Sequence, residues 1–469
     1  PIDVILDSLR AERDVQGWPV DRWNRAGRVS EWLGEESHRV VEALNTFACE
    51  PSPPEGALDG IFRALGSLKT EQLDPDRVSA AIDLILAHAD RLIKPNVLAF
   101  ADLVQSLGGS TAAPIDESRF LALLDAGLAQ TDSDSPSAIV DLSERGQTLT
   151  HAINAPGGKL TDGLLRWLWA GKRLGGSGIP ESFAERLARL VDGCGKLHLH
   201  ARIVCMQSLD TLFALDSAWT GVHLLPRLAW HGTFADQASW HWQAHLRYGR
   251  TNLDLAVAYR GDFLAALAVF NEQDSDAFRA ACQSFAALGA IYELFTKQEI
   301  REAFRNMGPQ GAPVVINTLR RRLFESETPA SIWRELIGRW LEQHWPHQAR
   351  FGTERVVTAV VELIIEADDA FPEALDWAKK RGLIRPLADR YGVLWRLTDD
   401  EHKAERRKTL AERFPAELCA FLSQILNDVP LQSHEQQKLA ALVETIEENL
   451  DANKEPPVSF HQLQQMLAG

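Results

Sequence analysis

The sequence predicts an all-α protein, organised as an irregular α-solenoid of stacked, HEAT-like helical hairpins. Apolar residues recur at helical spacing along its 469 residues, whereas the alternation typical of strands is not evident. Short breakers separate the helical segments, and short connections make successive helices antiparallel. Phe371-Pro372 and Phe414-Pro415 begin two similar segments 43 residues apart, an offset within the range of about 40–47 residues for HEAT and armadillo repeats.

Individual helices are predicted from their apolar stripes and start signals. Residues 76–92 follow the i, i+3, i+4, i+7 pattern after Asp74-Pro75, an N-cap residue followed by proline at the first helical position. We also expect a helix over 352–366, although its apolar residues are β-branched. These residues come in pairs every four positions and therefore share one helical face, whereas a strand would split each pair between its two faces.

Thr328-Pro329 gives a similar start signal before another single-faced stripe, in which we expect Trp333 and Trp340 to be buried. The chain is expected to contain an N-terminal helical array over 1–196, a helical-repeat region over 197–430 and a C-terminal helical cap over 431–469. Breakers between helices are predicted at 50–56, 107–114, 131–136, 154–158 and 175–180.

Composition limits the classes of partner. Lys and Arg number 49 and Asp and Glu 65, so the net charge is −16, which argues against a chain that coats nucleic acid or binds an anionic membrane as a whole. A local basic face remains compatible with this charge. No run approaches about 18 apolar residues, and no basic start precedes an apolar run. We therefore expect no membrane partner.

Five cysteines without a CxxC pair suit a reducing compartment, which predicts a cytoplasmic location. Because the sequence opens at Pro1 rather than Met, we interpret it as a piece of a longer polypeptide.

The glycine-rich segments do not match a phosphate-binding loop. Gly157-Gly158-Lys159 lacks both the upstream glycine of a Walker loop and the Ser or Thr after its lysine. In the segment from Gly175 to Gly178, the third glycine of the dinucleotide fingerprint is replaced by Glu181, and no strand precedes it. We interpret 175–180 as a turn between helices and expect no catalytic or cofactor-binding residues in this chain.

Histidines gather between His198 and His245. His241 and His245 share a helical face, as zinc ligands do, but Trp242 stands where the zincin pattern needs glutamate. Cys194 and Cys205 lie near His198, although buried cysteine more often acts as a small hydrophobe. We expect packing residues and no metal site here, while an enzyme site assembled from distant residues of this region remains a third hypothesis.

Clustered tryptophans and short basic runs are the candidates for an interaction surface. Trp240 and Trp242 are two residues apart, so their rings cannot share one helical face. We therefore expect one of them to be exposed or to pack between repeats. Exposed tryptophan is enriched at protein interfaces. Aligned basic runs would form a stripe able to meet phosphates or an acidic partner. The candidate residues are Trp240, Trp242, Arg320, Arg321, Arg322, Lys379, Lys380, Arg381, Arg406 and Arg407.

A series of spaced aromatic and proline signatures points to a family. They are Leu215–Trp219, Leu224–Pro226, Trp230, Trp242-Gln243, Leu246, Phe263-Leu264, Ile332-Trp333, Trp340–Glu342, Trp345-Pro346, Asp369–Ala374 and Phe414-Pro415. From about residue 197 to 430 the chain resembles the all-helical C-terminal region of bacterial defence-associated sirtuin proteins. In those proteins, an N-terminal sirtuin-type, NAD-consuming domain precedes a long helical sensor or scaffold.

The resemblance implies a non-catalytic scaffold and sensor in anti-phage defence, which recognises a phage or other invader protein and controls a linked NAD-consuming effector. The sirtuin nucleotide-binding signature is not found in 1–469, so no catalytic residue of the family is transferred, and the effector would lie upstream of Pro1 or be another attached domain. The alternative is a nucleic-acid-binding component of a defence complex that uses the basic runs.

Overall fold

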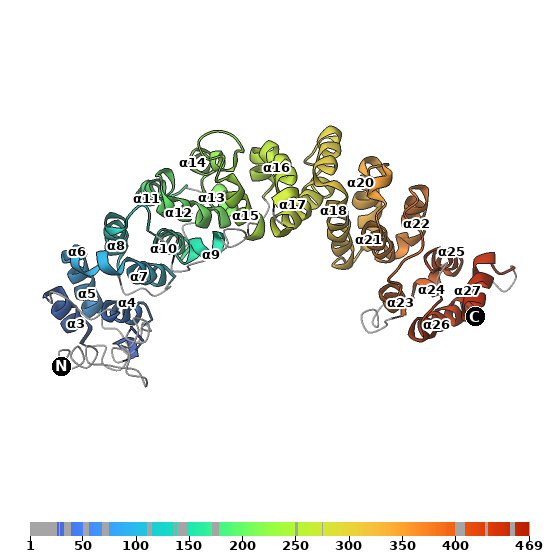
Figure 1. Cartoon of the computed structure of the whole chain (residues 1–469), viewed down its shortest axis with the longest axis horizontal. Helices are drawn as coiled ribbons and strands as arrows, with labels where there is room; N and C mark the ends of the chain where they lie inside the picture. The colour runs from blue at the N-terminus through green and yellow to red at the C-terminus, as the bar shows by residue number, and fades with distance from the viewer. Residues whose placement is uncertain are drawn as a thin grey trace. The chain divides into compact units, whose positions relative to one another are not determined.

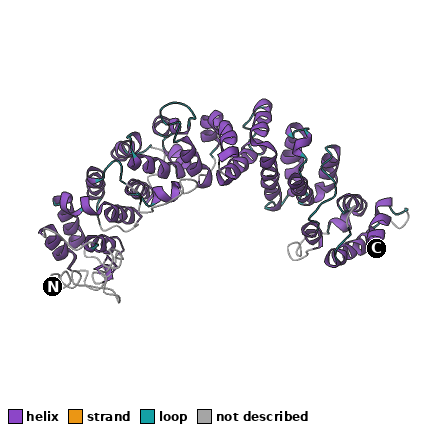
Figure 2. Ribbon diagram, in the orientation of Figure 1, coloured by secondary structure: helices purple, strands orange, loops and turns teal. Residues whose placement is uncertain are grey.

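Figures 1 and 2 show the computed structural model of the chain. The structure describes residues 26–27, 29–31, 39–49, 56–67, 75–109, 115–135, 137, 148–170, 178–248, 252–273, 275–398, 409–426, 430–450 and 455–468. Helices and loops make up these residues, and no strand occurs among them, which confirms the predicted all-α class. No helix in this part of the chain is long and apolar enough to cross a membrane.

The chain divides into two compact units, unit 1 from Pro1 to Tyr259 and unit 2 from Arg260 to Gly469. The division falls within α16 (Leu253–Gln273). This division lies at a different position from the region boundaries that we expect after residues 196 and 430. Those boundaries stay predictions.

The described helices of unit 1 from α3 to α15 have 3 to 15 residues. Their bounds are α3 (Val40–Cys49), α4 (Ala57–Ser67), α5 (Pro75–Ala87), α6 (Ala89–Leu92), η3 (Lys94–Asn96), α7 (Val97–Gly109), α8 (Glu117–Gln130), α9 (Thr148–Ile153), α10 (Pro156–Ala170), α11 (Glu181–Asp192), α12 (Lys196–Gln207), α13 (Leu209–Leu215), α14 (Ser217–His223), η4 (Leu225–Leu228) and α15 (Ala238–Tyr248). The expected start at Pro75 is confirmed, whereas Asp74, its expected N-cap, lies outside the described residues.

Glycine lets α10 approach α7 and α12 at backbone distance. A Cβ on Gly108 of α7 would overlap the carbonyl oxygen of Gly163 of α10, and a Cβ on Gly157 of α10 would overlap the carbonyl oxygen of Leu197 of α12. Two predicted breakers are therefore wrong in part. Residues 107–109 continue α7, and α10 begins at Pro156, because these glycines are needed for close helix packing rather than for turns.

Unit 2 contains the longest helix of the described residues, α18, and shorter helices after it. The bounds are α17 (Ser275–Ala290), α18 (Lys297–Phe324), α19 (Pro329–Ile332), the π-helical turn η5 (Trp333–Ile337), α20 (Gly338–His344), η6 (Ala349–Phe351), α21 (Glu354–Ile365), η7 (Asp368–Ala370), α22 (Phe371–Lys380), α23 (Tyr391–Thr398), α24 (Leu410–Arg413), α25 (Pro415–Ile425), α26 (Ser433–Asn449) and α27 (Val458–Ala468). Gly308, with φ of +62°, kinks α18 before Pro309.

Several predicted features of unit 2 are confirmed. The β-branched segment forms α21, which Thr353 caps by accepting a hydrogen bond from the backbone N–H of Val356. Trp333 and Trp340 are buried. Phe371 is buried and Phe414 half-buried, and their rings stack with centroids 6.2 Å apart, so the two Phe-Pro starts pack against one another.

The glycine contact between α7 and α10 can be tested with two adjacent residues. Gly108→Ala should destabilise the protein by about 1–3 kcal/mol, because the new methyl group must push the two helices apart. The matched control is Gly109→Ala, whose Cβ would meet only the flexible side chain of Arg166 at 3.3 Å. Thermal unfolding followed by circular dichroism measures both variants. Equal melting temperatures for the two variants would contradict the close approach.

Candidate functional site

The two tryptophans of the candidate surface differ in burial. Trp240 is half-buried in α15. Trp242 is fully buried, and its indole Nε1 donates a hydrogen bond to the carbonyl oxygen of Leu228 at 2.8 Å. Its assignment to an interaction surface was therefore wrong, because the ring packs edge-on against Tyr259 in the core of unit 1.

The basic runs of unit 2 are only partly available to a partner. Arg321, Arg322, Lys379 and Lys380 are exposed near the C-terminal ends of α18 and α22, where cations complement the helix dipole. Lys380 also forms an exposed ion pair with Asp376 of its own helix, at 2.6 Å.

Arg320 and Arg381 each form an ion pair with a residue of another helix. Arg320 of α18 forms a half-buried ion pair with Glu362 of α21. The side chain of Arg381 is 5% exposed and reaches Glu342 at 3.0 Å, so its assignment to the surface was wrong. Arg406 and Arg407 lie outside the described residues.

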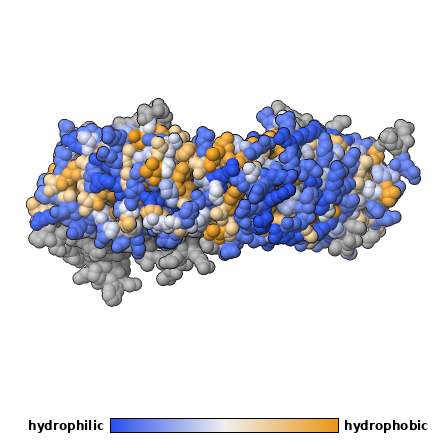
Figure 3. Space-filling view, turned by 90° about the horizontal axis from the view of Figure 1, so that it is seen from above, coloured by the Kyte–Doolittle hydropathy of each residue, from blue (hydrophilic) through white to orange (hydrophobic). Residues whose placement is uncertain are grey.

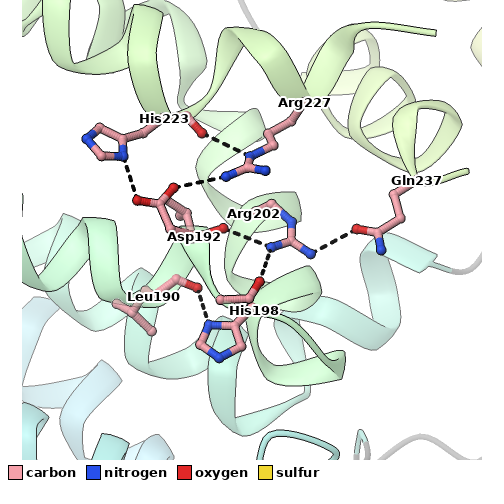
Figure 4. Close-up of polar contacts among 9 residues, drawn as sticks. Leu190, Asp192, His198, Arg202, His223, Arg227 and Gln237 are labelled. Carbon is pink, nitrogen blue, oxygen red and sulfur yellow. Dashed lines mark hydrogen bonds and ion pairs between the residues drawn. The ribbon is translucent and has the colours of Figure 1, made fainter. Parts of the chain in front are cut away.

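The histidine-rich region of unit 1 forms a polar network at the C-terminal end of α11 (Figure 4). Arg202 of α12 is 1% exposed and donates to the carbonyl oxygens of Val191 and Gly193 at 2.8 and 2.9 Å. The Nδ1 of His198 lies 2.9 Å from the carbonyl oxygen of Leu190. These carbonyl groups have no partner within the helix, so α12 provides their hydrogen bonds and caps α11.

Asp192 connects this helix end to two further elements. Its carboxylate lies 2.8 Å from His223 Nδ1 and 3.0 Å from Arg227 Nη2 (Figure 4). Arg227 also lies over the ring of Phe234, with its guanidinium carbon 3.8 Å from the centroid. A carboxylate at a helix C-terminus is unfavourable by itself, and the neighbouring cationic and imidazole side chains compensate for it. The arrangement joins α11 to α14 and η4.

Burial also lowers the pKa of Arg202 to about 10, which still leaves it charged at neutral pH. Its remaining Nη2 donates to the side-chain oxygen of Gln237 at 2.8 Å. Its charge is thus solvated by carbonyl and amide oxygens.

The deeper histidines are neutral packing residues. Burial is the main cause that lowers the pKa of His200 and His245 to about 4 and that of His241 to about 3. The Nδ1 of His241 lies 2.9 Å from the carbonyl oxygen of Arg227, and the Nε2 of His245 lies 3.3 Å from the Tyr259 hydroxyl.

Within the described residues, no group of three or more His, Cys, Asp or Glu side chains is arranged to hold a metal ion. Burial raises the pKa of the Cys205 thiol to about 12, so it carries no thiolate at neutral pH.

A separate pocket of about 480 Å³ lies in unit 2, and we call it the cationic pocket. Its cations are Lys297, Arg301 and Arg305 of α18 and Arg350 of η6, and the rings of Phe304, Trp345 and Phe351 also line it. The face of unit 2 that Figure 3 shows is largely hydrophilic.

Sequence reasoning missed the cationic pocket, although a signal was present. Lys297, Arg301 and Arg305 recur every four residues, which places them on one face of a helix. The fourth cation, Arg350, comes from a short element whose approach to α18 has no sequence signature.

Comparisons with protein-family models, with curated proteins and with solved structures give no match to this chain. The resemblance to defence-associated sirtuin proteins therefore stays a prediction.

The buried histidines predict how stability depends on pH. As pH falls from 6.5 toward about 4, the unfolded chain binds protons at His200, His241 and His245 while the folded chain does not, so the free energy of unfolding decreases. Each site contributes up to about 1.4 kcal/mol per pH unit. Urea unfolding between pH 6.5 and about 4 measures this free energy, and its pH dependence should be shallower in His245→Gln than in the native protein. Gln298→Ala, a change at an exposed side chain without a titratable group, should leave the pH dependence of the free energy of unfolding unchanged. Identical pH dependence in both variants would refute the assignment.

Proposed function

We propose that this chain is a non-catalytic helical scaffold and sensor, part of an anti-phage defence protein that recognises an invader protein and controls a linked NAD-consuming effector. The observation that carries the proposal is that five aromatic residues of the family resemblance are buried packing residues. Trp242, Trp333, Trp340, Trp345 and Phe371 are each at most 4% exposed. A resemblance based on core residues concerns the helical framework, and the defence role comes from the family that it resembles.

The finer architecture that we propose is an irregular, HEAT-like array of helical hairpins. Support comes from helices that pack on near neighbours in the chain: α17 on α18, α18 on α21, and α21 on α22. The stacked rings of Phe371 and Phe414 join two helix starts that are 43 residues apart in the sequence. Arrays of this kind offer extended surfaces to macromolecules.

The surface proposed for the invader protein comprises Arg321, Arg322, Lys379 and Lys380. These four side chains are exposed near helix ends in unit 2. They can complement an acidic surface of a protein partner, and charges of this kind contribute mainly to association rate and specificity.

Nucleic acid is the alternative partner of the same four cations. Binding of duplex DNA would weaken as salt rises, with a slope in the logarithmic plot of about −0.9 for each phosphate contact. Titrations of the purified chain with duplex DNA at several salt concentrations distinguish this function. A salt-dependent affinity for DNA that is lost when Arg321, Arg322, Lys379 and Lys380 are all changed to Glu would favour nucleic-acid binding over protein recognition.

The scaffold proposal predicts the outcome of phage infection in cells that carry the native gene. Infection should deplete NAD in these cells, and reversing the charge of Arg321, Arg322, Lys379 and Lys380 to Glu should prevent the depletion. The matched control is Arg279→Glu, an exposed cation of α17 outside this surface, which should behave like the native chain. The NAD content before and after infection is the measurement.

Two results would contradict the scaffold proposal. One is infection that leaves NAD unchanged in cells with the native gene. The other is turnover of NAD by the purified 469-residue chain, abolished by a point mutation within it. The second result would instead favour an enzyme site in the region from His198 to His245.

A further inference from the structure

The four cations of the cationic pocket form no ion pair with a carboxylate of the described residues. Elsewhere in unit 2 arginines are held by acidic side chains, as in the pairs Arg260–Glu299, Arg334–Glu373 and Arg413–Asp368. Within the described residues, no ion pair involves Lys297, Arg301, Arg305 or Arg350. The one carboxylate that lines the pocket, Glu342, is paired with Arg381 at 3.0 Å. Positive charge is therefore concentrated here in a chain whose net charge is −16.

The spacing of these cations carries a cost for the free protein. Lys297, Arg301 and Arg305 follow one another at i, i+4 and i+8 on α18, and like charges at this spacing destabilise a helix. An anion bound in the pocket would remove the repulsion. We propose that the cationic pocket binds a compact polyphosphate anion, such as inorganic pyrophosphate or the phosphate chain of a nucleotide.

The floor of the pocket consists of buried aromatic rings that contact one another. Phe304 is 2% exposed, and its ring contacts those of Trp345 and Phe351 edge-on, with centroids 5.6 and 5.9 Å away. Arg350 lies over the ring of Phe351, with its guanidinium carbon 5.0 Å from the centroid. An apolar floor under several cations strengthens their field at the mouth of the pocket.

The chemistry of the donors favours phosphate. Three of the four cations are arginines, whose planar guanidinium groups donate paired hydrogen bonds to phosphate oxygens. Burial, together with Lys297 and Arg301, lowers the pKa of His344 at the same wall, so its ring is neutral at pH 7 and adds no charge. A volume of about 480 Å³ falls within the range of small-molecule sites. A polyphosphate brings several negative charges into that volume.

Isothermal titration calorimetry of the full chain at constant ionic strength tests the proposal. The probes are inorganic pyrophosphate, inorganic triphosphate, ATP and adenosine. We expect pyrophosphate, triphosphate and ATP to bind and adenosine to give no heat of binding. ATP that binds more tightly than triphosphate identifies a nucleotide as the source of the phosphates, and equal affinities identify free polyphosphate.

The variant Arg301→Glu/Arg305→Glu should weaken pyrophosphate binding at least about tenfold, because it removes charge-assisted hydrogen bonds. The matched control is Arg279→Glu/Arg355→Glu, which makes the same charge change at two exposed residues of unit 2 outside the pocket and should keep the native affinity. Arg350→Gln is a second test that leaves α18 unaltered, and it should also weaken binding. Melting temperatures show whether each variant is folded.

Three results would overturn the polyphosphate site. The first is the absence of binding for every phosphate probe, and the second is an equal loss of affinity in the pocket variant and its matched control. The third is duplex DNA that binds with the same dependence on Arg301 and Arg305 and is not displaced by pyrophosphate, which would assign these cations to nucleic acid instead.

Discussion

Every described helix of this chain has to bury its apolar stripe against other helices, because the described residues contain no sheet that could cover it. The distance between helix axes is therefore the quantity on which the packing depends. In unit 1 it is set by residues without side chains: Gly108 faces Gly163 across α7 and α10, and Gly157 faces the backbone of Leu197 across α10 and α12. A methyl group at any of these positions changes the distance for both helices that it touches.

Unit 2 meets the same requirement with large rings. Phe304 of α18 contacts Phe285 of α17, Trp340 of α20 and Phe351 of η6, so one buried side chain fixes three neighbouring elements around the first half of α18. The cations on the adjacent face of that helix, beginning with Lys297, are thereby held on a framework that does not adapt easily. The first half of α18 therefore contributes one face to the aromatic core and the adjacent face to the cationic pocket.

The sequence was informative about helices and burial stripes, and much less about which side chains remain accessible. The β-branched pairs of 354–365 predicted α21, and the spacing of Trp333 and Trp340 predicted their burial. Trp242 and Arg381 were misassigned because their acceptors, the Leu228 carbonyl and Glu342, come from elements whose approach no local pattern encodes. The spacing of Lys297, Arg301 and Arg305 was readable, but a set of cations on one helix indicates a site only when the opposite wall is known.

The two units use positive charge in different ways, and the difference bears on function. In unit 1, Arg202 and Arg227 have partners within the protein. Arg202 donates to carbonyl groups at the end of α11, and its replacement would leave a buried carbonyl oxygen unsatisfied. Arg227 pairs with the more exposed carboxylate of Asp192. In the cationic pocket the guanidinium groups of Arg301 and Arg305 satisfy no described carboxylate and cap no described helix end. Cations without an ion pair among the described residues, gathered over buried aromatic rings, are the arrangement that an external anion would stabilise. The proposed anion site is therefore the cationic pocket and not the histidine-rich network, whose cations already have partners within the protein.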